Sequence, residues 1–396
     1  MQQLTALGLG ALVFLLLGSP VLNASSGGGE ESNIFVSVTG NNSMSVVRCK
    51  ATNGGGNAGP PGNDGVSCRE SDNQAVGFRT SWPANQYEGE EDWWWSGLSG
   101  EVIGLKASKS AKPLTKAENR IIVDTYTYAG VPAGLPTSGS NFIGVSPKGK
   151  TAWNSAREID EIQEIDIDPD SATFGQILTH IPVPLSADAG PGTATRGKMR
   201  PCDMSITPDN KYLWEPDIGG ETVTGVDIGA KSVMAQITLP RENPANRVIP
   251  FMLTTNGTVA LVENFEAPFG TESIIDVTDP ANPVHLKKLT QADGLGVTPM
   301  TSEFTPDGKY AYIIVNGSPS IAGGINVLDL DTLQISKTIA LPAGCRPHTG
   351  DFTNDDDYFV VNCSGTGSVA VISNELLEVV QEVALSGTSP RGVVTR

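Results

Sequence analysis

A unit of about fifty residues recurs along the second half of the chain and limits the possible folds more than any other feature. Each copy contains an apolar strand, a short turn and three further strand-like segments. The first residues of the turns lie 61, 47, 51 and 48 positions apart. Proline presets φ for a turn and glycine tolerates a positive φ, so these turns have a physical cause. They are Ser146–Gly149, Thr207–Asn210, Thr254–Gly257, Thr305–Gly308 and Thr353–Asp356.

Strands rich in aromatic and β-branched residues follow the turns, as in Tyr310–Ile313 and Tyr358–Val361. Four short strands per unit at this spacing are typical of the blades of a β-propeller. A β-sandwich is the alternative, but a sandwich does not repeat one turn motif so regularly. We therefore predict an all-β chain that forms a single β-propeller. The clear blades are expected to begin near residues 141, 199, 246, 298 and 345.

The two ends of the chain are expected to complete one blade together. Residues 389–396 match only the first strand of a blade, whereas 34–38 and 44–47 match the second and third. Such a blade closes the ring and removes two exposed sheet edges. With the five repeats it makes six blades, and strand-like segments between 74 and 128 indicate one more. The prediction is seven four-stranded blades, with six as the alternative and residues 51–99 as an irregular insertion.

The repeat resembles that of the YVTN-type seven-bladed β-propeller superfamily. The residues that carry the resemblance best are Arg346-Pro347-His348 through Val371 and Ser389 to Val393, and the likeness is clear from about Asn141 onward. The resemblance implies the fold. It says little about function, because this superfamily contains enzymes, electron-transfer subunits and scaffolds.

An uncharged apolar run from Leu4 to Leu17 predicts a secretory leader over residues 1–24. Residues 25–32 would then be a flexible start, and 33–396 the propeller. A membrane anchor is the alternative, but the run is nearer 14 residues than the roughly 20 that a bilayer requires. The predicted location is the extracellular space or the lumen of the secretory pathway, with no membrane span.

The five cysteines are interpreted with that compartment in mind. Cys345 and Cys363 flank a predicted hairpin symmetrically and should pair across it. Cys49 and Cys68 enclose a Gly/Asn/Pro-rich stretch that a covalent link would stabilise. Cys202 is left over, as a buried inert thiol or a reactive one.

Sequons for N-glycosylation recur along the chain and would matter in a eukaryotic host. One of them, at Asn23, lies in the predicted leader. The remaining candidates for glycosylation are Asn41, Asn256, Asn316 and Asn362.

The formal net charge of −18 and the isoelectric point near 4.5 decide which partners to expect. Such a surface repels phosphate backbones and anionic lipids, so neither nucleic acid nor a membrane surface is a predicted partner. A small molecule at the channel is the expected ligand. The acidic surface could also be an interaction face for a protein partner.

Three arginines fall at one position of the aligned repeats, at the start of the strand that lines a propeller channel: Arg200, Arg247 and Arg346. Arg391 lies two residues further along in the closing strand. Arginine donates paired hydrogen bonds, so these side chains could bind an anion or a polarised oxygen at the channel mouth. The alternative is that each arginine links its blade to the next one.

Other channel candidates are the acids Asp203, Glu303 and Asp351 and the nearby His348. A pair of carboxylates could bind calcium, as in lactonase-type propellers. The triplet Trp93, Trp94 and Trp95 could present an aromatic face to a ligand, or could plug the ring as a packed loop.

Several motifs are missing from the sequence. It has no Cys-x-x-Cys-His, no Gly-rich phosphate loop and no Gly-x-Ser-x-Gly elbow, and its three histidines are too few for a multi-histidine copper cluster. We therefore predict no cofactor and no metal ligands, with calcium as the alternative.

The preferred functional hypothesis is a cofactor-independent cyclase that works by positioning and by hydrogen bonds to developing charge. In size and character the chain resembles secreted fungal propeller hetero-Diels–Alderases of tropolone sesquiterpenoid biosynthesis. The resemblance implies that Arg200, Arg247, Arg346 and His348 would be catalytic. The tryptophan triplet, Arg391, Asp203, Glu303 and Asp351 would bind substrate. The alternatives are a non-catalytic binding or scaffold propeller, and a calcium-dependent lactonase-like hydrolase.

Overall fold

The computed structural model describes most of the chain from residue 31 to residue 395. The predicted leader and residues 25–30 lie outside the described residues. The described ranges are 31–40, 43–51, 65–75, 83–85, 92–98, 101–107, 119–121, 140–146, 150–157, 159–168, 170–193 and 196–395.

The described residues form antiparallel strands almost throughout, and one 3-10 turn at Gln291–Asp293 is their only helical element. Five four-stranded sheets follow the repeats in chain order, as predicted. They are β8–β11 (Ser140–Val145, Thr151–Ala156, Glu161–Asp166, Ile177–Pro182), β14–β17 (Ser205–Ile206, Tyr212–Asp217, Thr222–Asp227, Ser232–Thr238), β18–β21 (Ile249–Thr255, Val259–Phe265, Thr271–Asp276, Val284–Leu289), β22–β25 (Pro299–Phe304, Tyr310–Val315, Gly324–Asp329, Gln334–Ala340) and β26–β29 (Gly350–Phe352, Tyr358–Cys363, Ser368–Ser373, Glu378–Ala384).

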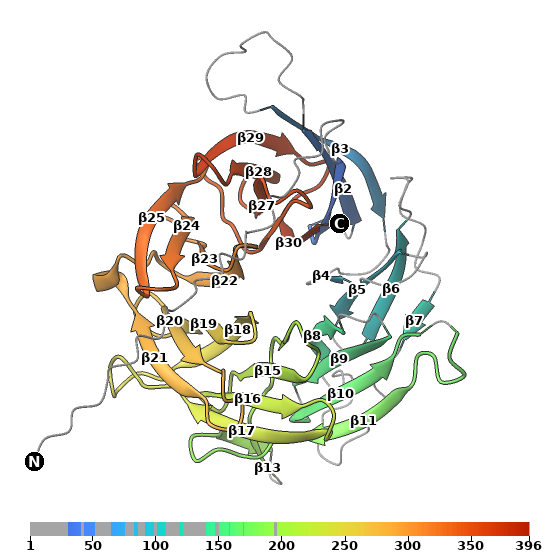
Figure 1. The fold of residues 1–396 in the computed structure, drawn as a ribbon, viewed down its shortest axis with the longest axis vertical. Helices are drawn as coiled ribbons and strands as arrows, with labels where there is room; N and C mark the ends of the chain where they lie inside the picture. The colour runs from blue at the N-terminus through green and yellow to red at the C-terminus, as the bar shows by residue number, and fades with distance from the viewer. Residues whose placement is uncertain are drawn as a thin grey trace, which may run out of the picture.

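A sixth four-stranded sheet joins the two ends of the chain. Its order is β3 (Val66–Ala75), β2 (Ser43–Ala51), β1 (Glu31–Val38) and β30 (Pro390–Thr395). The predicted closing strand therefore pairs with the N-terminal strand, with Ile34 opposite Thr395. The ring of sheets in Figure 1 is closed at this blade.

The irregular insertion predicted for residues 51–99 is wrong in part, because three strands lie within it. β3 completes the closing blade, and β4 (Pro83–Asn85) and β5 (Asp92–Leu98) belong to a further four-stranded sheet with β6 (Glu101–Ala107) and β7 (Asn119–Ile121). This sheet lies between β30 and β8 and contacts both (Figure 1). A short hairpin of β12 (Gly190–Thr193) and β13 (Arg196–Lys198) precedes β14.

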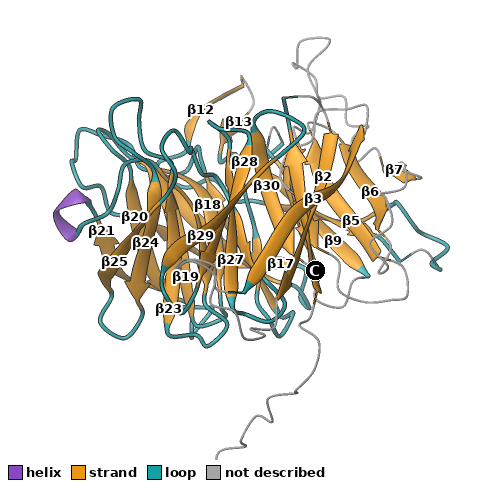
Figure 2. Ribbon diagram, turned by 90° about the horizontal axis from the view of Figure 1, so that it is seen from above, coloured by secondary structure: helices purple, strands orange, loops and turns teal. Residues whose placement is uncertain are grey.

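The ring has two faces that differ in their connections, and Figure 2 shows the strands spanning the thickness between them. We call the face that carries the turns between first and second strands the turn face, and the opposite one the loop face. The turns that begin at Thr207, Thr305 and Thr353 repeat one hydrogen-bond pattern. Thr305 Oγ1 donates to Asp307 Oδ1 (2.7 Å) and accepts from the Tyr310 backbone (3.1 Å), and the Thr207 turn has the same distances. The predicted turn chemistry is therefore confirmed.

The apolar core is divided among the spaces between adjacent blades. Trp214 of β15 and Leu253 of β18 pack between the blades β14–β17 and β18–β21. Tyr312 of β23 and Phe359 of β27 pack between the blades β22–β25 and β26–β29. Burying a large apolar side chain contributes roughly 2–3 kcal/mol, so each blade is stabilised by its two neighbours. This ring of mutual contacts holds the inner strands around the axis.

Charged residues with positive φ also connect successive blades at the loop face. Asp160 (φ 54°) accepts the backbone N–H groups of Met199 (3.1 Å) and Arg200 (2.9 Å) at the start of the next blade. Glu221 (φ 57°) accepts the N–H of Val248 (3.2 Å) one blade further on. A left-handed conformation costs a non-glycine residue about 1 kcal/mol, which these hydrogen bonds offset.

Both predicted disulfides are confirmed: Cys49 bonds Cys68 across β2 and β3, and Cys345 bonds Cys363. Cys202 is a buried free thiol whose sulfur accepts a hydrogen bond from the Arg157 guanidinium (3.3 Å). Among the described residues, no helix is long and apolar enough to cross a membrane.

Candidate functional site

A cavity of about 380 Å³ lies on the ring axis, and its wall is formed by the inner strands β8, β14, β18, β22, β26 and β30 together with residues flanking them. Asp203, Glu303 and Asp351, which were singled out in the sequence, all lie in this wall. Glu263 of β19 also lines it. A small cavity lined by four carboxyl groups is the candidate functional site.

Two of these acids accept hydrogen bonds from backbone N–H groups of the neighbouring inner strand, on the side of that strand that has no sheet partner. Asp203 Oδ2 accepts the N–H of Leu253 (3.0 Å), and Asp351 Oδ2 accepts the N–H of Thr395 (2.7 Å). An inner strand has no sheet partner on its axial side, so its buried N–H groups need such acceptors. Asp203 and Asp351 therefore link adjacent blades as well as facing the cavity.

Glu303 differs from these two, because its carboxyl group forms no hydrogen bond with another described residue. It is half-buried in the cavity wall on β22, and Asp351 lies on β26, the inner strand of the next blade. Burial holds the pKa of Glu303 well above its usual range, and repulsion from Asp351, Glu263 and Asp203 raises it further. Burial and repulsion therefore both favour the protonated form of Glu303, which can donate a proton.

The cavity acids differ in pKa although all are carboxyl groups. Burial raises the pKa of Asp351 to about 6, against hydrogen bonds from Thr395 and Phe352 that stabilise the charged form. Burial raises the pKa of Asp203 to about 7 in the same way. Both keep some exposed surface, yet protein surrounds the cavity and removes most of the solvation that an open surface would provide.

Glu263 is one of two adjacent carboxyl groups that are fully buried beside the cavity. Glu263 of β19 and Glu272 of β20 are directly opposite each other in the sheet, and both are 0% exposed. Burial raises the pKa of Glu263 to about 8, and burial together with the Glu263 charge holds the pKa of Glu272 well above its usual range. The pair is therefore largely protonated at neutral pH.

The sequence analysis missed Glu263 and Glu272, and it also missed a second buried pair, Glu215 and Asp217 of β15. Asp217 Oδ2 accepts the hydroxyls of Thr222 and Thr224 (both 2.7 Å). Glu215 and Asp217 are both 0% exposed, and burial raises the pKa of Asp217 to about 7. An acidic residue inside an apolar second or third strand was the available signal for both pairs.

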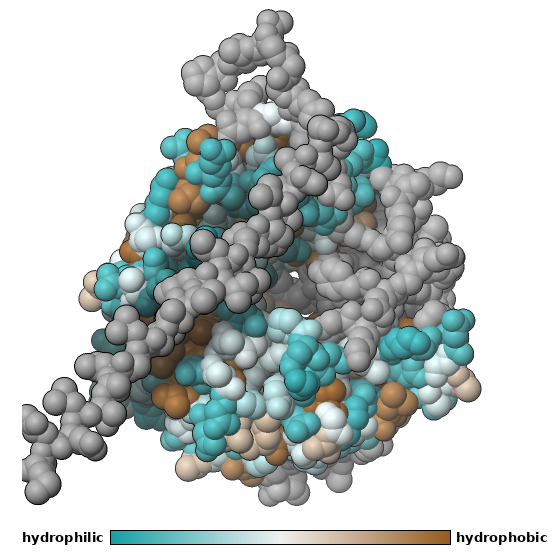
Figure 3. Space-filling model, in the orientation of Figure 1, coloured by the Kyte–Doolittle hydropathy of each residue, from teal (hydrophilic) through white to brown (hydrophobic). Residues whose placement is uncertain are grey.

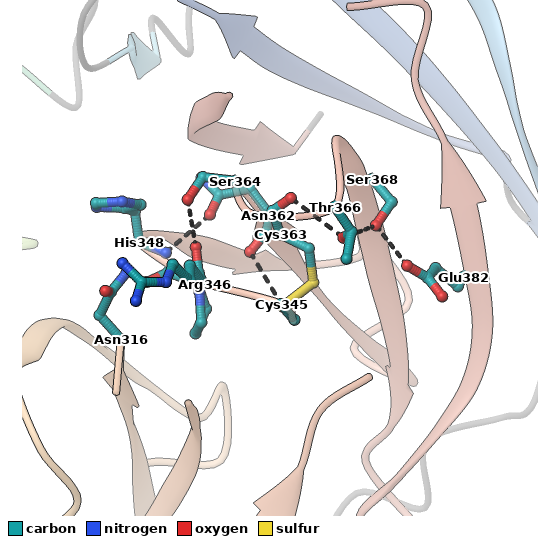
Figure 4. Close-up of a disulfide and its surroundings, with 11 residues drawn as sticks. Asn316, Cys345, Arg346, His348, Asn362, Cys363, Ser364, Thr366, Ser368 and Glu382 are labelled. Carbon is teal, nitrogen blue, oxygen red and sulfur yellow. Dashed lines mark hydrogen bonds between the residues drawn. A yellow bond between two sulfur atoms is a disulfide. The ribbon is translucent and has the colours of Figure 1, made fainter. Parts of the chain in front are cut away.

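His348 lies near the loop face with Arg346, beside Asn316 and the Cys345–Cys363 disulfide (Figure 4). Its backbone N–H donates to Asn362 Oδ1 (2.8 Å), and its carbonyl accepts from Thr301 Oγ1 (2.7 Å). Burial, together with the nearby charges of Arg391 and Arg346, lowers the pKa of His348 to about 3. The imidazole is therefore neutral at physiological pH, which rules out a proton-donating imidazolium.

The arginines that share one repeat position do not share one environment. Arg247 Nε donates to Glu221 Oε1 (2.6 Å), and its Nη2 donates to the Gly219 carbonyl (2.7 Å) in the preceding blade. This is the blade-linking role that the sequence left open. Arg200 is exposed, and none of the four predicted arginines lines the axial cavity.

Other predicted positions are placed as follows. Trp93, Trp94 and Trp95 lie in β5, so the alternative of a packed loop is wrong. Their side chains lie outside the described residues, and the aromatic face for a ligand stays a prediction. Asn41 is also outside them. Asn362 is 0% exposed and its amide nitrogen donates to the Arg391 carbonyl, so its prediction as a glycosylation site is wrong.

Calcium requires several oxygen ligands around one point. Within the described ranges, no group of three or more Asp, Glu, His or Cys side chains is arranged to hold a metal ion. Asp203 and Asp351 direct oxygens at backbone N–H groups, and Glu263 is buried against Glu272. The residues present therefore do not fit a calcium site.

Comparisons with known proteins support the fold. No family model and no curated protein matches the sequence. The periplasmic gluconolactonase PpgL of Pseudomonas aeruginosa is 12% identical, with 92% of this chain and 99% of that one covered and a TM-score of 0.63. A Bacteroides fragilis protein provisionally named a 6-phosphogluconolactonase is 16% identical, with 92% and 98% covered and a TM-score of 0.62. The chain thus has a β-propeller fold, and neither the comparisons nor the arginine geometry supports a Diels–Alderase.

Proposed function

We propose that the protein is a lactonase-like hydrolase that acts on a small, uncharged lactone in the axial cavity. The observation that carries the proposal is the neighbouring pair of Glu303 and Asp351, which occupy one wall but have separated pKa values. Two carboxyl groups held in different protonation states are the usual arrangement for acid and base catalysis. The similarity in fold to a periplasmic gluconolactonase agrees with this reaction class.

The two groups would divide the proton transfers between them. Asp351, ionised at neutral pH, accepts a proton from water as the water oxygen bonds to the lactone carbonyl carbon. Glu303, protonated, donates to the ring oxygen as the bond between that oxygen and the carbonyl carbon breaks. The product is the hydroxy acid, and the proton passes back from Asp351 to Glu303 through solvent.

The cavity also restricts the substrate. Its volume of about 380 Å³ suits a small molecule, and the ionised Asp351 carboxylate in its wall repels a phosphate group. The substrate class is therefore an unphosphorylated lactone. We further infer that the sheet β4–β7 is the seventh blade and that the chain acts outside the cytoplasm, where its two disulfides persist.

The experiment is proton release from D-glucono-1,5-lactone and from its 6-phosphate, measured with the purified full chain at neutral pH. The unphosphorylated lactone should react at least about tenfold faster than the phosphate. Glu303→Gln and Asp351→Asn should each lower kcat about 100-fold or more. Asp209→Asn, which removes an acid that does not line the cavity, should leave the rate unchanged. No hydrolysis of either lactone, or full activity of Glu303→Gln, would overturn the proposal.

A further inference from the structure

A second cavity, of about 540 Å³, opens between blades β22–β25 and β26–β29, and it shares no lining residue with the axial cavity. It lies at the Thr305 turn, on the turn face. Three aromatic residues line it: Tyr310, Tyr312 and Phe352. The rings of Tyr312 and Phe352 have centroids 5.4 Å apart, and Tyr310 is 37% exposed and so accessible to a ligand.

One residue that lines this cavity distinguishes the outer strand of its blade from the outer strands of other blades. The outer strand β25 has a bulge at Ser336, because Leu328 pairs with Ile335 and Val327 pairs with Lys337. The Ser336 hydroxyl donates to the Val327 carbonyl (3.1 Å) of its own blade. A short polar side chain therefore stands where four other blades place a larger apolar one. The residues at those bulges are Leu178, Met234, Leu286 and Val380.

The charge around the cavity is negative. Asp307 and Asp356 line it, and no lining residue is basic. A hydrogen bond from Thr305 lowers the pKa of Asp307, so this carboxyl group is ionised at neutral pH. Lys309 lies 3.3 Å from Asp307, but its side chain is 71% exposed, and such a pair is weak and screened. Hydrophilic residues also cover much of the described surface seen along the ring axis in Figure 3.

Aromatic walls with carboxylates at the rim favour one ligand chemistry. Aromatic rings attract a cation within about 6 Å of their centres, and an alkylated ammonium loses little hydration when it leaves water. We propose that this cavity binds a small organic cation that carries an alkylated ammonium group. The proposal is independent of any reaction in the axial cavity.

The test is calorimetric titration of the full chain with choline and, separately, with 3,3-dimethyl-1-butanol, its uncharged isostere. Choline should bind at a single site at least about tenfold more tightly than the alcohol. Tyr310→Ala, at an accessible position, should weaken choline binding about three- to tenfold. Ser336→Met, which introduces the residue that β17 has at this bulge, should fill the cavity and abolish binding.

A matched control distinguishes the cavity from the general acidity of the surface. Asp307→Asn removes the rim charge, whereas Asp209→Asn makes the same change in the equivalent turn of another blade. Only Asp307→Asn should weaken choline binding. Equal affinity for choline and the alcohol, equal loss in the two asparagine variants, or unchanged binding by Tyr310→Ala would overturn the proposal.

Discussion

Glu263 and Glu272 lie directly opposite each other on β19 and β20, and the fold buries both carboxyl groups completely. Two adjacent buried carboxylates cannot both be ionised at low cost, so at least one proton remains on the pair. Folding therefore raises the proton affinity of this pair, and the chain binds protons there when it folds near neutral pH. This has a direct consequence for stability.

The free energy of unfolding should fall as the pH rises from about 5 to 8. A carboxyl group with a raised pKa contributes fully below its unfolded value, near 4.5 for Glu263, and the contribution is lost up to a pH of about 8. Between its unfolded and its folded pKa, each such group lowers the free energy of unfolding by about 1.4 kcal/mol per pH unit. Thermal unfolding by circular dichroism should give a Tm several degrees higher at pH 5 than at pH 8.

Glu263→Gln should flatten this profile, because it removes the group that must ionise while keeping a similar shape. The same change at Glu378, an exposed residue of β29, should leave the profile unchanged. A Tm that is equal at pH 5 and pH 8 in the unmodified chain would contradict the assignment.

Glu221 should contribute more to stability than either arginine that pairs with it. Its carboxylate is 2% exposed and receives Arg241 Nε (2.8 Å), Arg247 Nε (2.6 Å) and the Val248 backbone N–H. Glu221→Ala leaves that N–H without its acceptor and should cost about 2–3 kcal/mol. Arg247→Ala removes a 43% exposed partner and should cost about 1 kcal/mol.

Urea unfolding of both variants measures these differences. If Arg247→Ala is as destabilising as Glu221→Ala, the arginine rather than the carboxylate is the centre of this contact. If Arg247→Ala also abolishes catalysis without loss of stability, the blade-linking role assigned to it is wrong.

The disulfide Cys49–Cys68 should stabilise the closing blade. It closes a segment with a sequence separation of 19, for which chain-entropy arguments give about 3 kcal/mol. The double variant Cys49→Ser/Cys68→Ser should therefore unfold at lower urea concentration. Thiol titration provides the check: the denatured, unreduced chain should react at Cys202 alone, and the reduced chain at five cysteines.

The fold was largely predictable because the turns between first and second strands share a motif that is visible in the sequence. Thr305 and Asp307 form the same hydrogen bonds as Thr207 and Asp209, so a visible motif repeats a local geometry. The β3 and β5 strands were missed because their sequences, such as Asp92–Leu98, lack those turns. The tryptophans of β5 drew attention as a loop feature, although they lie in a strand.

The site was only partly predictable, because alignment gives a position along a strand and not the surroundings of a side chain. Asp203 and Asp351 could be placed in the channel wall, since inner-strand positions follow from the repeat. The contacts of Arg200 and Arg247 could not be placed, because Asp160 of the preceding blade accepts only the backbone N–H of Arg200, whereas Glu221 accepts the side chain of Arg247. The cavity at Ser336 depends on a bulge that only the pairing register reveals.

Asn362 should be one of the most important polar residues for ring closure. Its Oδ1 accepts the His348 N–H (2.8 Å), and its Nδ2 donates to the carbonyl of Arg391 in β30 and to Thr349 Oγ1 (3.3 Å). Asn362→Ala leaves the buried His348 N–H without its acceptor and removes one of two side-chain donors to the Arg391 carbonyl, which Thr349 Oγ1 still reaches (2.9 Å). It should cost about 2–3 kcal/mol.

Asn256→Ala is the matched control, because the Asn256 side chain bonds only within its own turn, at Thr258 and Val259. It should cost about 1 kcal/mol or less. Limited proteolysis gives a second measurement, since opening the ring at β1 and β30 exposes the C-terminal strand. Faster cleavage after Arg391 is expected in Asn362→Ala and not in Asn256→Ala. Equal stability of the two variants would show that ring closure rests on the apolar contacts of β1 and β30 and not on this amide.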